Sequence, residues 1–182
     1  KLNVNGIAIG RALNDENSTT VVGNDAATNL SDTGGIHNTA IGFQSLKANF
    51  QEPYNTSVGS ETLKAFNGGG TGQNTGIGAK ALGQTTTGGQ NIALGYEAGY
   101  DNKSGSRNIF IGNGAGVSDA NGAMNDVVAI GYNAKATTDA QTYIKNDDIY
   151  FDVVNDISGT AGKLHIGMIN FTPGGVTGSI PQ

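Results

Sequence analysis

The sequence contains no cysteine and no tryptophan, and only three prolines. Without cysteine, neither a disulfide framework nor a thiolate metal site can stabilise the fold. Leu, Ile, Val and Phe together account for 39 of the 182 residues. That fraction, about a fifth, is near the level at which chains remain disordered. The composition therefore excludes an ordinary deep hydrophobic core, and we expect stability to come from repetition and from association.

Charged residues and long apolar segments are also scarce. Charged residues make up 14% of the chain, the formal net charge is -5, and the ten Lys and Arg are scattered. A nucleic-acid partner is not expected, because phosphate neutralisation requires a basic stripe. Since no apolar run approaches the roughly 20 residues that cross a bilayer, and no signal peptide is visible, membrane insertion is not expected either. The chain begins at Lys1 close to a repeat strand, which we interpret as a processed product or a fragment.

Glycine and asparagine are abundant instead, with 30 and 21 copies, and they follow a repeat. A short aliphatic-Gly segment recurs eight times before residue 136, with Gly-to-Gly spacings of 13, 19, 17, 19, 17, 17 and 19 residues. Recurrence at such short intervals indicates stacked units. Because all spacings are odd, units differ by even numbers and each side chain keeps its face of the strand. The pattern predicts an all-β repeat solenoid whose length variation lies in outward loops.

Equivalent positions of the repeat form columns of one residue type. Three residues before the Gly, every unit carries a Thr, Ile or Val, the β-branched class that suits strands. The residue directly before the Gly is aliphatic and points to the same face. We predict that this second column stacks in a narrow, dry interior as the structural core. Its members are Ile9, Val22, Ile41, Val58, Ile77, Leu94, Ile111 and Ile130.

Two further columns consist of small residues. The position between the two strand columns is small in six of eight units, as at Ala40 and Gly76, and points to the opposite face. Another small column lies three residues after the Gly, as at Ala81 and Ala98. We interpret both as sites of close approach, which suggests packing against other copies with threefold symmetry.

Asparagine opens five consecutive units. This residue tolerates turn conformations and hydrogen-bonds to neighbouring backbone. In stacked coils the side-chain amides are expected to form a ladder along the array. The five are Asn38, Asn55, Asn74, Asn91 and Asn108.

The units 38–46, 55–63 and 74–82 read NTAIGFQSL, NTSVGSETL and NTGIGAKAL. They resemble the head repeat of trimeric autotransporter adhesins, and even more the NTAIGxxAL repeats of bacteriophage tail fibres and spikes. The resemblance covers residues 1–136. It implies a left-handed parallel β-roll of 17–19-residue coils, in which three chains pack side by side as a homotrimer. Because neither a heptad-patterned stalk nor a membrane anchor follows, the phage version is favoured.

The resemblance implies a non-enzymatic fibre or spike protein on a virion surface that mediates host attachment. Its partners would be further copies of itself, other virion proteins, and a host-surface receptor or glycan. Three weak sites on one stiff rod reach useful avidity through effective concentration. The alternative is the head of a bacterial trimeric adhesin, exposed on the bacterial cell surface.

The repeat fades over residues 137–182. Strands are expected at 141–145, 149–154 and 163–169, forming a small β cap followed by an extended tail. A solenoid needs a covered last coil, because an open end exposes apolar side chains and unpaired strand edges. Alternatively this segment is a receptor-binding tip or a joint to another virion protein. In that case the contact residues would be Tyr143, Tyr150, Phe151 and Phe171, although we expect these rings to pack the cap's own core.

Ingredients for catalysis are few. His37 and His165 are the only histidines, and neither has a carboxylate or hydroxyl at a recognised motif spacing. We therefore expect no enzymatic activity and no cofactor. The densest acidic cluster could offer oxygen ligands to Ca²⁺, but turn and solvated-edge roles are preferred. Its members are Asp147, Asp148, Asp152 and Asp156.

The Thr column also suggests an ice-binding solenoid. Such proteins present flat Thr-x-Thr ranks, whereas here the second residue of each rank is aliphatic, as in Thr39-Ala40-Ile41. Since that aliphatic residue is expected to point inward, an ice-binding role is disfavoured.

Overall fold

The computed structural model describes residues 2–4, 7–11, 19–30, 35–49, 51–68, 71–118 and 122–145. All regular elements in these ranges are strands, so the described residues provide no helix long and apolar enough to cross a membrane. The strands in chain order are β1 Leu2–Val4, β2 Ile7–Arg11, β3 Thr20–Val22, β4 Thr39–Ile41, β5 Thr56–Val58, β6 Thr75–Ile77, β7 Ile92–Leu94, β8 Ile109–Ile111, β9 Gly116–Val117, β10 Val128–Ile130, β11 Lys135–Ala136 and β12 Thr142–Ile144.

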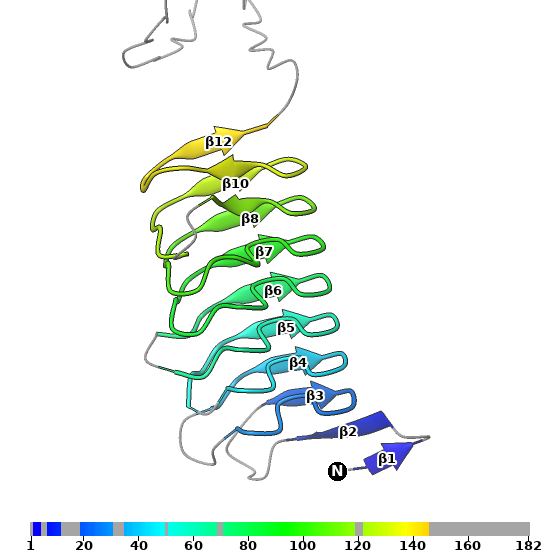
Figure 1. The fold of residues 1–182 in the computed structure, drawn as a ribbon. Helices are drawn as coiled ribbons and strands as arrows, with labels where there is room; N and C mark the ends of the chain where they lie inside the picture. Colours follow the sequence, from blue (N-terminus) through cyan, green and yellow to red (C-terminus); the bar gives the residue numbers. More distant parts are fainter. Residues whose placement is uncertain are drawn as a thin grey trace, which may run out of the picture. The chain divides into compact units, whose positions relative to one another are not determined.

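Ten of these strands form one sheet, in the order β1-β2-β3-β4-β5-β6-β7-β8-β10-β12. From β3 onward neighbouring strands are parallel and in register, so that Thr39 pairs with Thr56 and Ile41 with Val58. Each chain segment leaves its strand, turns back and returns to start the next one directly above (Figure 1). The result is a β-solenoid of about seven turns, which confirms the all-β repeat architecture predicted from the periodicity.

The first unit departs from this pattern. Strand β2 pairs antiparallel with both β1 and β3, with Ile9 opposite Leu2 on one side and Val22 on the other. The expectation of a parallel coil around Ile9-Gly10 is therefore wrong. Only 13 residues separate Gly10 from Gly23, whereas the other units take 17 or 19. The shorter connection suits an antiparallel neighbour, since a parallel one requires a longer crossover.

At the other end the parallel stacking continues past residue 136. Strand β12 pairs parallel with β10, with Tyr143 opposite Ala129. The predicted strand 141–145 thus adds a further rung to the solenoid. A second, two-stranded parallel sheet joins β9 to β11 on the returning side. The rest of the predicted cap, including the expected strands 149–154 and 163–169, lies outside the described residues.

A glycine ends each parallel strand of the large sheet from β3 to β10 at a sharp corner. Gly42, Gly59 and Gly78 have φ between +128° and +137°, a region that side chains rarely adopt. At Gly59 an added Cβ would lie 2.6 Å from the carbonyl oxygen of Gly78 in the next coil. Stacked corners therefore require glycine for both the backbone conformation and the close contact.

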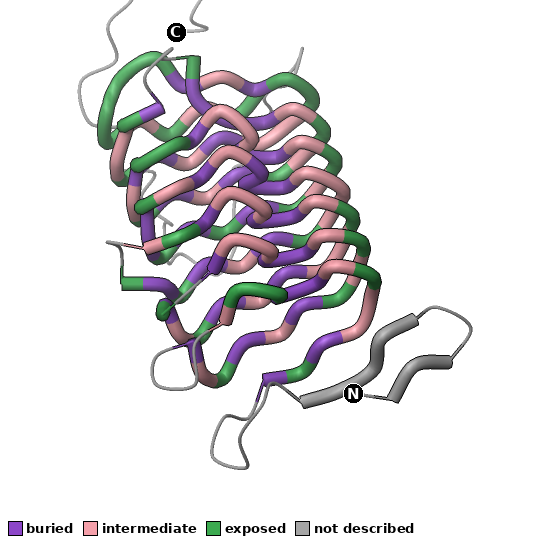
Figure 2. Tube along the Cα trace, turned by 60° about the horizontal axis from the view of Figure 1, so that its bottom comes forward, coloured by how far each residue is buried: buried purple, intermediate pink, exposed green. Residues whose placement is uncertain are grey.

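The interior of the solenoid is filled by the small strand column and by residues of the returning segment. Ala40, Ser57 and Ala93 are fully buried at the centre of their strands. Leu46 and Leu63 reach the same interior from the turn that follows the Gly and are also fully buried. Figure 2 shows buried positions recurring at equivalent places in the stacked coils. Each coil thus contributes roughly one large apolar side chain opposite a small one.

The aliphatic column faces outward, which corrects the prediction of a dry central line. Ile41, Ile77, Leu94 and Ile111 are exposed, with relative accessibilities between 36% and 46%. Val22, Val58 and Ile130 are half-buried, and nothing is described for the side chain of Ile9. The small columns correspondingly face the interior of their own chain and do not receive a neighbouring copy.

A volume constraint explains this orientation. The interior already holds Leu46, Leu63 and Leu82 from the returning segments, all fully buried. At Gly76 an added Cβ would lie 2.7 Å from Cγ2 of Thr62 and 3.7 Å from Cδ1 of Leu63. A medium aliphatic pointing inward from the strand would overfill such a thin coil, and overpacking is destabilising.

Candidate functional site

The outer face of the large sheet is an uncharged strip. Each parallel strand presents two outward residues, and all of them from β3 to β12 are Thr, Ile, Val or Leu. Ile92 and Leu94 are each 46% exposed on β7, and Ile144 on β12 is 47% exposed. With strands about 4.8 Å apart, eight stacked strands give a strip about 34 Å long. Contiguous apolar surface on this scale marks an interaction site.

Exposed aromatic rings flank this strip. Phe43, Tyr96 and Tyr132 each follow the corner glycine directly and are 45%, 47% and 68% exposed. Because they stand one position beyond the corner, they extend the apolar surface at the carboxyl ends of β4, β7 and β10. Rings of this kind are typical anchors of protein interfaces.

The five asparagines open their strands as a buried ladder. Each is at most 1% exposed, and its side-chain oxygen accepts a hydrogen bond from a backbone N–H of the next coil. The N–H of Asn55 donates to Oδ1 of Asn38 at 2.7 Å, and that of Asn74 to Oδ1 of Asn55 at 3.0 Å. The series continues through Asn91 and Asn108 to the N–H of Val127, with distances of 3.0, 3.0 and 2.9 Å. These residues hold the coils together and leave no amide for a ligand.

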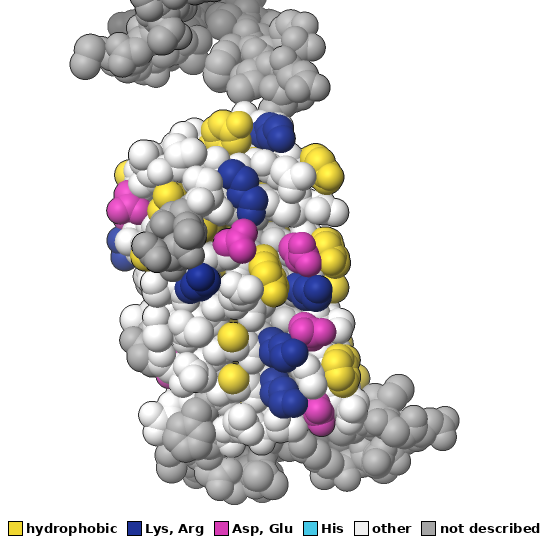
Figure 3. Space-filling model, viewed as in Figure 1, with side chains coloured by type: hydrophobic (Ala, Val, Ile, Leu, Met, Phe, Trp, Pro, Cys, Tyr) yellow, Lys and Arg dark blue, Asp and Glu magenta, His cyan; other side chains and the backbone are white. Residues whose placement is uncertain are grey.

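A column of ionic side chains runs along the face formed by the turns. Figure 3 shows basic and acidic side chains close to one another along the solenoid on this side. Lys64 Nζ lies 2.9 Å from Glu61 Oε2, and the hydrogen bond to Lys64 lowers the pKa of the Glu61 carboxyl. Lys47 pairs with Asp25 in the preceding coil at 3.3 Å. Surface pairs of this kind contribute little stability but define a pattern of donors and acceptors.

A second exposed column precedes the asparagines. There the ring of His37 stacks on that of Tyr54, with centroids 5.3 Å apart. Farther along, Arg107 holds Asp126 through two hydrogen bonds of 2.6 and 2.8 Å. This hydrogen-bonded pairing lowers the pKa of Asp126 and raises that of Arg107. Residues at equivalent positions of neighbouring coils therefore contact each other in pairs. They do not converge on one reactive centre.

The predicted contact residues of the C-terminal segment are divided by the structure. Tyr143 occupies the inward position of β12 and packs, partly buried, against the hydrophobic core. Tyr143 therefore packs against the core of the solenoid in the last described rung, whereas the expected packing was within a separate cap. Tyr150, Phe151 and Phe171 lie outside the described residues, as does the acidic cluster of Asp147, Asp148, Asp152 and Asp156. Within the described ranges, no group of His, Asp or Glu is arranged to hold a metal ion.

Comparisons with protein-family models, with curated proteins and with solved structures gave no match. Sequence reasoning found the residues of the strip but assigned them to the interior. The missed signal lies in two columns of polar side chains that must face solvent. Two residues after the Gly stand Gln44, Glu61 and Lys80, and five residues after it stand Lys47 and Lys64.

Proposed function

We propose that the chain is a non-enzymatic structural subunit of a bacteriophage fibre or spike. In this proposal its repeats associate with other copies through the outer sheet face and present a host-binding surface. The observation that carries the proposal is the uncharged strip of outward Thr, Ile, Val and Leu residues along the whole parallel sheet. The alternative, the head of a bacterial trimeric surface adhesin, uses the same strip in the same way.

A further copy of the same chain is the partner that fits the strip best. The strip lacks charge, so its burial leaves no ionic group desolvated without a partner. Its repeat is set by the strand spacing of about 4.8 Å, and only a partner with the same spacing keeps side chains in register over all rungs. A parallel copy supplies this match, because its outward columns repeat at the same interval. Association would cover Ile77, Leu94 and Ile111, which are unusually exposed in the single chain.

The resemblance of the repeat units to trimeric fibres supplies the finer points of the proposal. It implies three chains, a left-handed winding of each coil, and a C-terminal cap over residues 137–182. A virion location and a host receptor or glycan as partner belong to the same proposal. The exposed columns of the turns, which point away from the strip, remain accessible in such an assembly.

The mass of the full chain in solution tests the association. One chain has a mass of 18.5 kDa, and we expect sedimentation equilibrium to give about three times this value. Changing Ile77 and Ile111 together to Asp should return the mass to that of one chain with an unaltered β circular dichroism spectrum. The reason is that both side chains are exposed in the isolated solenoid, so the charges are costly only in the interface.

Thr87 provides the matched control, because it is also exposed but lies in a returning loop away from the strip. Thr87→Asp should leave the mass unchanged. A wild-type chain that stays monomeric at high concentration, or a double Asp variant that still assembles, would contradict the proposal.

The orientation of the aliphatic column also gives a second candidate function. The first and third residues of each strand both face outward and form a regular array on the outer face. The pairs are Thr39 with Ile41, Thr56 with Val58, and Thr75 with Ile77. The reason for disfavouring ice binding, an inward second residue, therefore no longer applies. Against it, the Thr column changes to Ile92 and Ile109 farther along. A thermal hysteresis measurement on the full chain distinguishes the two, since an assembled strip would be covered and inactive.

A further inference from the structure

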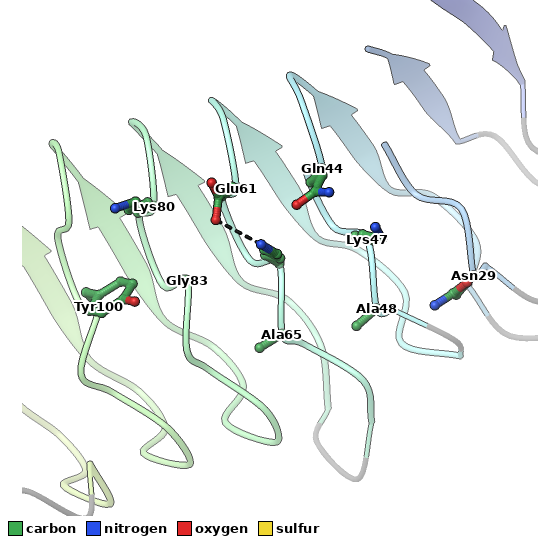
Figure 4. Close-up of a pocket in the computed structure, with 10 residues that line it drawn as sticks. Asn29, Gln44, Lys47, Ala48, Glu61, Ala65, Lys80, Gly83 and Tyr100 are labelled. Carbon is green, nitrogen blue, oxygen red and sulfur yellow. Dashed lines mark hydrogen bonds and ion pairs between the residues drawn. The ribbon is translucent and has the colours of Figure 1, made fainter. Parts of the chain in front are cut away.

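A shallow groove crosses the turns that follow β3, β4, β5, β6 and β7. It encloses about 500 Å³ and runs along the solenoid axis on the side formed by the returning segments (Figure 4). Five successive turns at the strand spacing give it a length of about 19 Å. A linear chain molecule can therefore lie in it across several coils.

The floor of the groove is made of small residues and ends at an aromatic ring. Ala48 and Ala65 occupy equivalent positions of consecutive coils. Gly83 and Tyr100 line the groove in the next two coils, at the position that Lys47 and Lys64 hold in the earlier ones (Figure 4). A Cβ added at Gly83 would lie 3.1 Å from two carbons of the Tyr100 ring, so the ring lies directly over this glycine. The small floor keeps the groove open, and the half-buried ring offers an apolar surface within it.

One wall of the groove is a row of paired donors and acceptors. Lys64 pairs with Glu61 at 2.9 Å, and Lys80 with Glu97 of the next coil at 3.5 Å. Lys47 pairs with Asp25, which also accepts a hydrogen bond of 3.4 Å from Gln44. Each ammonium group of the lining thus pairs with a carboxylate, of which Glu61 lines the groove and Asp25 and Glu97 do not. All six side chains are between 33% and 43% exposed.

This balance of charge decides between classes of ligand. A polyanion would need unpaired cations along its path, and each of the three lysines in the lining, Lys47, Lys64 and Lys80, is already paired with a carboxylate. An extended peptide would need free backbone edges. The N–H groups of Ala48 and Ala65 on the floor already donate to carbonyls of the next coil, at 3.1 and 3.3 Å. Hydroxyl groups suit the wall better, because each can donate to a carboxylate oxygen and accept from an ammonium group.

We propose that this groove binds a linear neutral polysaccharide, with the sugar chain lying along the solenoid axis. The coil spacing is close to the length of one pyranose unit in an extended chain, so successive sugars meet successive ion pairs. Tyr100 would stack against the apolar face of one ring. This inference rests on the proposed attachment function and names the class of host molecule that the assembly would recognise.

A glycan array tests the proposal with the full chain. The array carries defined linear neutral hexasaccharides of glucose, mannose and galactose, bacterial surface polysaccharides, and polygalacturonate as an acidic probe. We expect binding to neutral glycans, retained in 1 M NaCl. Binding should fall by about tenfold or more in Tyr100→Leu, which loses the stacking ring. Tyr100→Phe keeps the ring and should bind within a few-fold of wild type.

Two further variants separate recognition from folding. Glu61→Gln with Lys64→Met removes an exposed pair from the wall and should weaken binding without changing the thermal unfolding midpoint. Tyr54→Leu is the aromatic control, because Tyr54 is 56% exposed in a column outside the groove. The proposal is overturned if no neutral glycan binds wild type more strongly than Tyr100→Leu, or if polygalacturonate binds best and is lost in salt.

The molecular mass of the same preparations is also measured by sedimentation equilibrium. A chain that assembles normally and binds no neutral glycan rejects the groove but not the proposed fibre. A chain that stays monomeric and still binds glycan through Tyr100 rejects the proposed fibre but not the groove.

Discussion

At the scale of the residue, the corner glycines have the strictest requirement in this fold. Gly78 has φ of +131°, and a Cβ there would clash with the carbonyl oxygen of Gly95 in the next coil. Changing the backbone conformation of Gly78, or making room for a Cβ there, would require the backbones of the two coils to separate. The recurring glycine of the sequence therefore reflects a steric demand that is repeated at every coil.

Substitution of Gly78 by Ala should destabilise the chain by about 3 kcal/mol or more, because strain and backbone contact add. Gly116→Ala is the control: its φ is not positive, and the nearest atom to an added Cβ is Lys135 Nζ at 3.4 Å. That change should alter stability by less than about 1 kcal/mol. Urea unfolding followed by circular dichroism measures both. Equal losses in the two variants would show that the corner geometry is not what requires glycine.

At the scale of the element, each coil accommodates about one large side chain, and its source changes along the chain. In the coils of β4, β5 and β6 the returning segment supplies Leu46, Leu63 and Leu82. In the next coil the equivalent position is Gly99, and a Cβ there would lie 2.5 Å from the ring of Phe110. Phe110, on strand β8 of the following coil, occupies the strand position that is small in six of eight units. A large strand residue and a small return residue have thus exchanged places.

This exchange predicts a compensating pair of substitutions. Phe110→Ala should cost about 3–5 kcal/mol through the cavity that it leaves. Gly99→Leu alone should be destabilising by overpacking, although its φ of +63° resembles that of Leu82 at +52°. The double variant should recover part of both losses, with a coupling energy of about 1–3 kcal/mol. A double-mutant cycle in urea measures it, and simple additivity would mean that the two side chains do not share one space.

At the scale of the whole molecule, the solenoid is a stack of equivalent coils that contact mainly their neighbours. Hydrogen bonds join each coil to the next on both sides, as from Thr75 N–H to Asn91 O and from Leu82 N–H to Ala98 O. In such an array stability is close to a sum of terms from each coil and each interface. A whole coil can therefore be removed without disturbing the others.

Deletion of residues 74–90 removes one period and joins Gln73 directly to Asn91, which stands 17 residues after Asn74. The shortened chain should fold with the same β spectrum and a modestly lower unfolding midpoint. Deletion of Gly76 alone is a far smaller change, but it leaves two residues between Asn74 and the corner Gly78, where the strand needs three. That variant should lose cooperative unfolding. If the one-residue deletion were the milder change, coils would not be the independent units of this fold.

The sequence alone was sufficient for the coil period, the short strands, the corner glycines and the opening asparagines. These features recur in most coils, so a local requirement is visible as a column. Which side of the strand is interior was decided only by the tertiary structure. Alternation shows that Ala40 and Ile41 point to opposite faces but not which face is enclosed. That choice depends on Leu46 and its equivalents, which fill the interior from the returning segment and leave room only for the small column. The antiparallel placement of β2 and the groove beside Tyr100 likewise depend on how distant segments pack, and this packing exists only once the coils are stacked.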